Sequence, residues 1–293
     1  MTNAAPDAFS RDLPFSDADF RAIADLAQER FGLNLAESKK PLVYSRLSRR
    51  LKSRKVGSFS EYLVLLNRKD EEGERLELIS ALTTNVTSFF REQHHFDTLR
   101  DALVTELNAK AMMGQRVRIW SAGCSSGPEP YSIAMTVLDA LPDAAGKDLR
   151  ILATDIDPKI VKKAREGVYP NEEISGLQAA MRSRWTRACT DDPKRAVVSD
   201  TLKSLITFNE LNLMSDWPFH GPFDAIFCRN VAIYFNQETQ QRLWQRFYAM
   251  LNPGGLLFIG HSERVTGPAL QHLEGIGITS YRKSRTPAHP PLQ

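Results

Sequence analysis

Cysteine is scarce in this sequence, with three residues among 293, and the three stand far apart at Cys124, Cys189 and Cys228. This spacing excludes both the paired disulfide framework of small secreted domains and a cysteine zinc site. No apolar run is long enough to cross a bilayer, and residues 1–15 lack the charged and then apolar pattern of a secretory leader. We therefore expect a cytoplasmic protein with reduced, mostly buried cysteines and no membrane insertion of its own.

A strong excess of one charge is also missing, because 38 basic and 35 acidic residues leave a formal net charge of +3. Any basic surface must therefore come from local clustering. Six histidines are present without a metal-ligand spacing, so we expect no metal. We expect His94, His95 and His261 to pack or to form local hydrogen bonds. The apolar content of 42% is enough to bury two modest cores.

Helical signals dominate residues 1–84, which we expect to form an all-helical domain. Ser16 and Ser58 have the character of helix N-caps, and each has an acidic residue three positions later, Asp19 and Glu61. Those carboxylates are placed to reach back to the free amides of the first turn.

Strands and helices alternate from Arg116 onward, which predicts an α/β domain with a mostly parallel sheet covered on both faces. Leu243 and Phe247 recur at helical spacing after Asn236 and are expected to pack on that sheet. The expected organisation is a helical domain (1–84), a linker (85–110), the α/β domain (111–285) with an inserted segment at about 170–204, and a disordered tail (286–293).

A glycine-containing turn stands between an apolar run and a helical pattern at 119–131, IWSAGCSSGPEPY. Glycines let such a turn tighten and let the backbone approach a nucleotide-like ligand. A second apolar run at 149–154 ends on Asp155, a position from which a carboxylate accepts hydrogen bonds from ribose hydroxyls. These two features suit NAD as well as S-adenosylmethionine and leave both open.

The later elements favour S-adenosylmethionine. Three more apolar runs follow, two of which lead to polar tips, and the succession is typical of a methyltransferase. The runs are 205–208 before Asn212 and Leu213, 223–228 before Arg229 and Asn230, and 256–260 after the turn at 251–255.

Basic residues cluster between positions 39 and 55, where eight lysines and arginines occur without an acidic residue. On a helix, Val43, Leu47 and Leu51 would face the core and leave a concentrated positive face on much of the opposite side. A solvated face is the simpler explanation of such a run. The arginines on this face are Arg46, Arg49 and Arg50.

Five motifs in order along most of the chain resemble those of the chemotaxis receptor glutamate O-methyltransferases, the CheR family. They are TTNVTSFFRE (83–92), WSAGCSSGPEPYSIAM (120–135), ATDIDP (153–158), FDAIFCRNVAIYF (223–235) and LLFIGHSE (256–263). The resemblance implies an all-α domain followed by a Rossmann-like class I methyltransferase domain with a small antiparallel β insertion. It also implies methyl transfer from S-adenosylmethionine to chemoreceptor glutamates at membrane receptor arrays.

The resemblance further implies the site residues. Arg91 and Tyr234 would be catalytic, and the basic arginines Arg46, Arg49 and Arg50 would meet acidic receptor helices. The residues that it implies for cofactor binding are Asn85, Thr87, Arg91, Gly123, Glu129, Asp155, Asn212, Leu213, Arg229 and Asn230.

Three positions or segments depart from the usual family pattern. Pro128 stands where the family commonly has an acidic residue, and Ala232 where it commonly has a larger one. The inserted segment binds a receptor-tail peptide in some family members, and those members have glycines in the loop that corresponds to residues 188–195. This sequence has none there.

Alternatives remain at this point. A nucleic-acid methyltransferase would use the basic helix to bind phosphates and would bind with a steep salt dependence. Its expected Asn-Pro-Pro-Tyr type of strand tip is absent, because the sequence reads CRNV there. A non-catalytic cofactor-binding signalling module would require a damaged pocket, whereas each expected polar residue is present. A dehydrogenase is a weaker fourth possibility.

Overall fold

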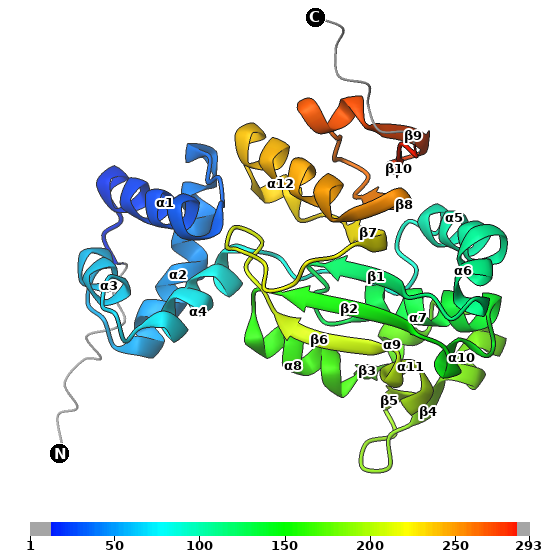
Figure 1. Ribbon diagram of the computed structural model, residues 1–293. Coiled ribbons are helices and arrows are strands. Elements are labelled where there is room, and N and C mark those ends of the chain that lie inside the picture. Colours follow the sequence, from blue (N-terminus) through cyan, green and yellow to red (C-terminus); the bar gives the residue numbers. More distant parts are fainter. Residues whose placement is uncertain (1–12, 286–293) are drawn as a thin grey trace, which may run out of the picture. The chain divides into compact units, whose positions relative to one another are not determined.

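The computed structural model describes residues 13–285 (Figure 1), and the chain divides into two compact units. The first unit ends at Thr84 and the second begins at Asn85. The tail expected at 286–293 lies outside the described residues. Within residues 13–285, no helix is both long enough and apolar enough to span a bilayer.

The first unit is all-helical, as predicted. Its elements are α1 (Asp17–Phe31), the 3-10 helix η1 (Glu37–Lys39), α2 (Lys40–Arg54), α3 (Phe59–Leu66) and α4 (Glu72–Leu82).

Both predicted N-caps of the first unit are confirmed. The Ser16 hydroxyl accepts the N–H of Asp19, whose carboxylate accepts the N–H of Ser16 in return. Ser58 caps α3 in the same way, whereas the Glu61 carboxylate accepts the N–H of Gly57. The predicted inner face of α2 is also confirmed, because all three of its apolar residues, Val43, Leu47 and Leu51, are buried.

The second unit is built on a seven-stranded sheet in the order β6-β2-β1-β7-β8-β10-β9. Neighbouring strands from β6 to β8 are parallel, and the last two pairings are antiparallel. The mostly parallel α/β fold is therefore confirmed, and a C-terminal hairpin is added to it. The strands are β1 (Val117–Ala122), β2 (Leu149–Asp155), β6 (Ile206–Glu210), β7 (Phe223–Cys228), β8 (Leu251–Ile259), β9 (Leu273–Gly277) and β10 (Ser280–Lys283).

Helices cover both faces of this sheet (Figure 1). Phe96 of α5 stacks on Phe227 of β7, with ring centroids 5.8 Å apart, and Phe247 of α12 packs edge-on against Trp120 of β1 on the other face. The helices are α5 (His94–Ala102), the π-helix η2 (Leu103–Leu107), α6 (Asn108–Met112), α7 (Pro128–Ala140), η3 (Ala144–Gly146), α8 (Pro158–Glu166), η4 (Ala232–Tyr234), α12 (Gln237–Met250) and η5 (Pro268–Gln271).

The long connection between β2 and β6 forms its own small antiparallel sheet in the order β3-β5-β4. Tyr169 of β3 is fully buried, and its hydroxyl donates to the carbonyl of Ser126 at 2.7 Å, which ties this insertion to the glycine turn. Its elements are β3 (Val168–Pro170), α9 (Asn171–Ile174), α10 (Ala179–Trp185), β4 (Thr186–Ala188), β5 (Arg195–Val198) and α11 (Asp200–Ser204).

Candidate active site

The candidate site lies at the carboxyl ends of β1, β2 and β7. Because β1 lies between the two others and all three are parallel, their final residues and the loops after them meet at one edge of the sheet. Open α/β sheets bind ligands at this edge. Asp155 ends β2, and Arg229 follows β7 directly.

Asp155 is held by the glycine turn that follows β1. Its two carboxylate oxygens accept the N–H groups of Ser125 at 2.8 Å and Asp157 at 3.1 Å. The side chain is buried, and this burial raises the pKa of Asp155, although the two backbone donors partly offset the effect. The result is a pre-positioned acceptor at the strand tip.

Gly123 is required where the turn meets the segment after β7. Its φ is +86°, and a Cβ at this position would lie 2.4 Å from Cγ2 of Val231. Any larger residue would therefore displace the segment that contains Arg229 and Asn230.

Glu129 stands in the first turn of α7 and is buried. Its carboxylate accepts the hydroxyl of Ser121 at 2.7 Å and Nη1 of Arg229 at 3.2 Å. Burial raises the pKa of Glu129, and the positive charge of Arg229 only partly offsets this effect. Glu129 is thus a desolvated carboxyl that lacks full charge compensation.

Arg229 is the centre of the site, with its side chain only 2% exposed. In addition to its hydrogen bond with Glu129, the Arg229 guanidinium donates to the carbonyl of Arg91. Its Nη2 lies 3.5 Å from the Glu92 carboxylate. Two carboxylates around one guanidinium leave one net negative charge when both are ionised. Arg229 Nε is buried without a hydrogen-bond partner.

The segment after Arg229 is shaped by Glu263. Asn230 has a φ of +59°, and the Glu263 carboxylate accepts the N–H groups of Asn230 and Ile233, both at 3.1 Å, together with that of Gly260. Burial raises the pKa of Glu263, and these backbone donors partly offset it. Tyr234 ends η4 in this segment and is half-buried.

The predicted linker residues lie beside this edge. The Asn85 carbonyl accepts the Ser125 hydroxyl at 3.3 Å, and Arg91 donates to the carbonyl of Val86 at 3.1 Å. Thr87 is half-buried, whereas Asn85 is exposed.

The residues after β6 join the same edge, because the N–H of Leu211 donates to the Asp155 carbonyl at 2.8 Å. Asn212 Oδ1 accepts the N–H of Met214, and Leu213 is buried. Hydrogen bonds therefore join the linker and the segments after β1, β2, β6 and β7 at this edge. That the ten expected residues bind the cofactor stays a prediction.

The three arginines expected to meet the receptor differ in their surroundings within the helical unit. Arg46 donates to the carbonyls at the end of α4, and Arg50 forms two hydrogen bonds with the buried carboxylate of Glu74. Arg49 is exposed and has no hydrogen bond or ion pair among residues 13–285. The basic run is therefore less open than helical spacing alone predicts, since α4 engages Arg46, Arg50 and also Arg54, which lies 3.3 Å from the Glu74 carboxylate.

Comparison with known proteins identifies both units. Residues 18–83 match the family model for the CheR methyltransferase all-alpha domain, and residues 85–281 match that for the CheR methyltransferase SAM binding domain. The chain belongs to the CheR methyltransferase family. The predicted family and enzyme class are thereby confirmed.

Relatives of this CheR chain match it over most of their length. A probable chemotaxis protein methyltransferase of Rhizobium etli is 51% identical over 86% of this chain and 94% of its own. Chemotaxis protein methyltransferase 2 of Pseudomonas aeruginosa is 42% identical over 93% and 95%, and the chemotaxis protein methyltransferase of Escherichia coli is 44% identical over 89% and 88%.

The residues at this edge fit S-adenosylmethionine. The excess negative charge around Arg229 suits a ligand that carries an ammonium and a sulfonium cation. Arg229 Nε, a buried polar atom without a hydrogen-bond partner among the described residues, lies at the same place.

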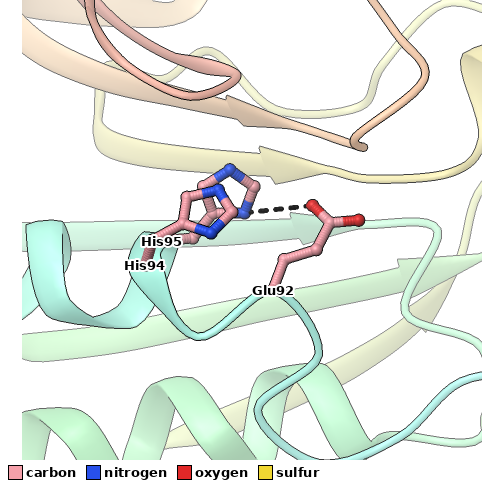
Figure 2. A group of neighbouring side chains, drawn as sticks. All are labelled: Glu92, His94 and His95. Carbon is pink, nitrogen blue, oxygen red and sulfur yellow. Dashed lines mark ion pairs between the residues drawn. The ribbon is translucent and has the colours of Figure 1, made fainter.

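Glu92, His94 and His95 form a neighbouring group whose potential metal-binding atoms all lie within 4.8 Å of one another (Figure 2). Two observations disfavour a cation there. Arg229 already compensates Glu92 at 3.5 Å, and Nε2 of both imidazoles faces the Ile278 carbonyl. The absence of a metal from this CheR protein stays a prediction.

Sequence reasoning missed two residues of this site. Glu92 and Glu263 both fall inside CheR motifs, at the ends of TTNVTSFFRE and LLFIGHSE. An acidic residue within a matched motif was the available signal. Their partners are distant in sequence, so spacing alone could not reveal them.

Proposed function

We propose that this CheR methyltransferase transfers the methyl group of S-adenosylmethionine to glutamate carboxylates on the cytoplasmic helices of chemoreceptors. Glutamyl methyl esters and S-adenosylhomocysteine would be the products. Family membership and relatives named chemotaxis protein methyltransferases support the proposal. The observation that carries it is the buried Glu129–Arg229 pair beside Asp155 at the strand tips.

The donor would be held by residues from four strand ends at this edge and from the linker. Asp155 would accept the ribose hydroxyls, Glu129 the ammonium group, and Asn212 and Leu213 would flank the adenine. Asn85, Thr87, Arg91, Arg229 and Asn230 would contact the amino-acid portion, and Gly123 would allow the backbone to approach it.

The acceptor needs no general base. A glutamate side chain has an unperturbed pKa of about 4.3, so it is already a carboxylate at neutral pH. S-adenosylmethionine supplies an electrophilic methyl group on a sulfonium. A carboxylate oxygen forms the new bond to the methyl carbon while the bond from that carbon to sulfur breaks, and the electron pair of the broken bond stays on sulfur.

Arg91 and Tyr234 would orient the acceptor. Arg91 is half-buried, and its guanidinium makes one hydrogen bond among residues 13–285, to the Val86 carbonyl, so most of its donors remain for a substrate carboxylate. In-line placement and exclusion of water would then supply the catalysis.

The receptor would meet the basic helix through Arg49, supported by Arg46 and Arg50. Screened attraction between this helix and acidic receptor helices would raise the encounter rate more than the final affinity. Arg46 and Arg50 would act mainly by holding α2 and α4 together, because their donors are already used.

We further propose that a peptide from the receptor tail binds to the inserted sheet β3-β5-β4. β4 is the outer strand of its sheet, so its free edge can accept another strand. A pocket of about 770 Å³ lies beside it and includes Thr186, Arg187 and Ala188 of β4.

The test is incubation with methyl-labelled S-adenosylmethionine and membranes that contain a chemoreceptor from the same source. Base-labile label that is released as methanol is expected on the receptor, and receptors without their C-terminal tail should be labelled more slowly. Label on nucleic acid instead of receptor would contradict the proposal. Donor binding without any transfer would indicate a signalling module.

A further inference from the structure

Glu92 is held in a conformation that glutamate rarely adopts. Its φ is +57°, in the left-handed region, and its side chain is only 13% exposed. Strained residues of this kind persist only where their surroundings over-determine them, and they gather at functional sites.

Three groups surround the Glu92 carboxylate, and Figure 2 shows one of them, the His95 ring. One oxygen accepts the N–H of His261 at 3.2 Å. The other lies 3.5 Å from Nη2 of Arg229 and 3.5 Å from Nδ1 of His95. The Glu92 carboxylate thus meets Nη2 of Arg229, whereas the Glu129 carboxylate meets Nη1.

His95 packs beside this carboxylate as a neutral ring. It is fully buried, and burial together with the charge of Arg229 lowers the pKa of His95 to about 3. Its Nε2 lies 3.2 Å from the Ile278 carbonyl and 3.0 Å from the Thr279 hydroxyl. A carbonyl oxygen only accepts, so the tautomer that fits carries its proton on Nε2 and leaves Nδ1 facing Glu92 without a hydrogen bond.

Arg229 therefore forms ion pairs with two carboxylates, those of Glu92 and Glu129, and its charge is shared between them. Without Glu92, its charge would be balanced by Glu129 alone. Glu129 would then be a weaker acceptor for a cationic ligand, because a neutralised ion pair attracts a second cation less strongly.

We propose that Glu92 is a positioning residue that shares Arg229 with Glu129 and so keeps Glu129 available for the cationic amino-acid portion of the methyl donor. This inference rests on the proposed function only in naming that donor. Glu92 acts through Arg229 and touches neither donor nor acceptor.

The test is a double-mutant cycle on donor affinity, measured by calorimetry with S-adenosylmethionine. Glu92→Gln should weaken binding about 10-fold, in the lower range for residues that orient a binding group. Arg229→Met should weaken it as well. If Glu92 acts through Arg229, Glu92→Gln should cause no further loss in the Arg229→Met background.

Glu106→Gln is the matched control, since Glu106 likewise pairs with arginine, here Arg282 and Arg285, but lies outside the site. Its donor affinity should equal that of the wild type. If Glu92→Gln fails to fold, Glu92→Asn replaces it, because asparagine tolerates the positive φ better. Tryptophan fluorescence shows whether each variant is folded.

Unchanged affinity in Glu92→Gln, or losses that add in the double variant, would overturn the inference. Dialysis against EDTA that weakens donor binding, with recovery in zinc, would overturn it in favour of a cation at these residues. If the wild type binds donor and the cycle behaves as expected but no receptor is methylated, the inference stands and the proposed function fails.

Discussion

At the residue scale, the site is a set of carboxylates placed around one buried arginine. Asp155, Glu129 and Arg229 were predictable, because each stands at or just after a strand end or helix start, where pattern reading is most reliable. The role of Glu92 was not predictable. Its position depends on a positive φ and on the distant residues Arg229 and His261, neither of which leaves a local pattern.

Replacing Arg91 tests the proposed division between binding and chemistry. Arg91→Ala should lower kcat about 10- to 100-fold, because it removes a charge that orients the acceptor in the transition state. Donor affinity should change much less. Single-turnover methylation and calorimetry give the two quantities.

Arg100→Ala serves as the comparison for Arg91, because Arg100 is an exposed arginine of the same unit that pairs only with Asp97. It should leave both quantities unchanged. Equal losses of kcat and donor affinity in Arg91→Ala would refute a role in orienting the acceptor.

At the element scale, α2 shows what helical periodicity predicts and what it leaves out. Spacing correctly predicted the buried face with Val43 and Leu47, since only local geometry is needed for that. It could not predict that Arg50 binds Glu74, which lies 24 residues away on α4. Hydrogen bonds and ion pairs with α4, which is distant in sequence, therefore engage part of the basic face of α2 inside the helical unit.

Arg49 should therefore carry the receptor interaction of this helix. Arg49→Glu should raise the KM for receptor several-fold at low salt, and the effect should shrink at high salt because the attraction is screened. Folding should be unaffected, since Arg49 is exposed. Methylation rates over a range of receptor and salt concentrations provide the measurement.

Two further variants serve as controls for Arg49→Glu. Arg68→Glu makes the same charge change at another exposed position of the helical unit and should leave receptor KM unchanged. Arg50→Ala should instead reduce the stability of this unit by about 2 kcal/mol, because charged hydrogen bonds to Glu74 are lost. A receptor effect of Arg68→Glu as large as that of Arg49→Glu would argue for unspecific electrostatics.

At the scale of the whole molecule, the division into a helical unit and an α/β unit was predictable because hydrophobic periodicity changes along the chain. The order of the seven strands was not predictable from periodicity, since pairing between distant strands leaves no local trace. All four tryptophans belong to the second unit, at positions 120, 185, 217 and 244. Tryptophan fluorescence therefore reports unfolding of the α/β unit alone.

The buried carboxyl of Glu129 gives this unit a predictable pH dependence. Its pKa is raised in the folded state, so its contribution to stability is fully present below the unfolded value and is lost as pH rises through the folded value. The free energy of unfolding of the wild type relative to Glu129→Gln should therefore fall with rising pH above about 4.5. Urea titrations followed by tryptophan fluorescence measure this difference, and a difference that is constant or rises over that range would contradict the raised pKa.

The inserted sheet begins after α8 and ends before α11, and the N–H of Val198 at its end donates to the carbonyl of Gly167 at its start at 2.9 Å. Its entry and exit points are therefore close together, and the strand tips that hold Asp155 and Arg229 do not depend on the insertion's outer strand β4. The partner contact that we propose for β4 can therefore change without a change in the residues at these strand tips.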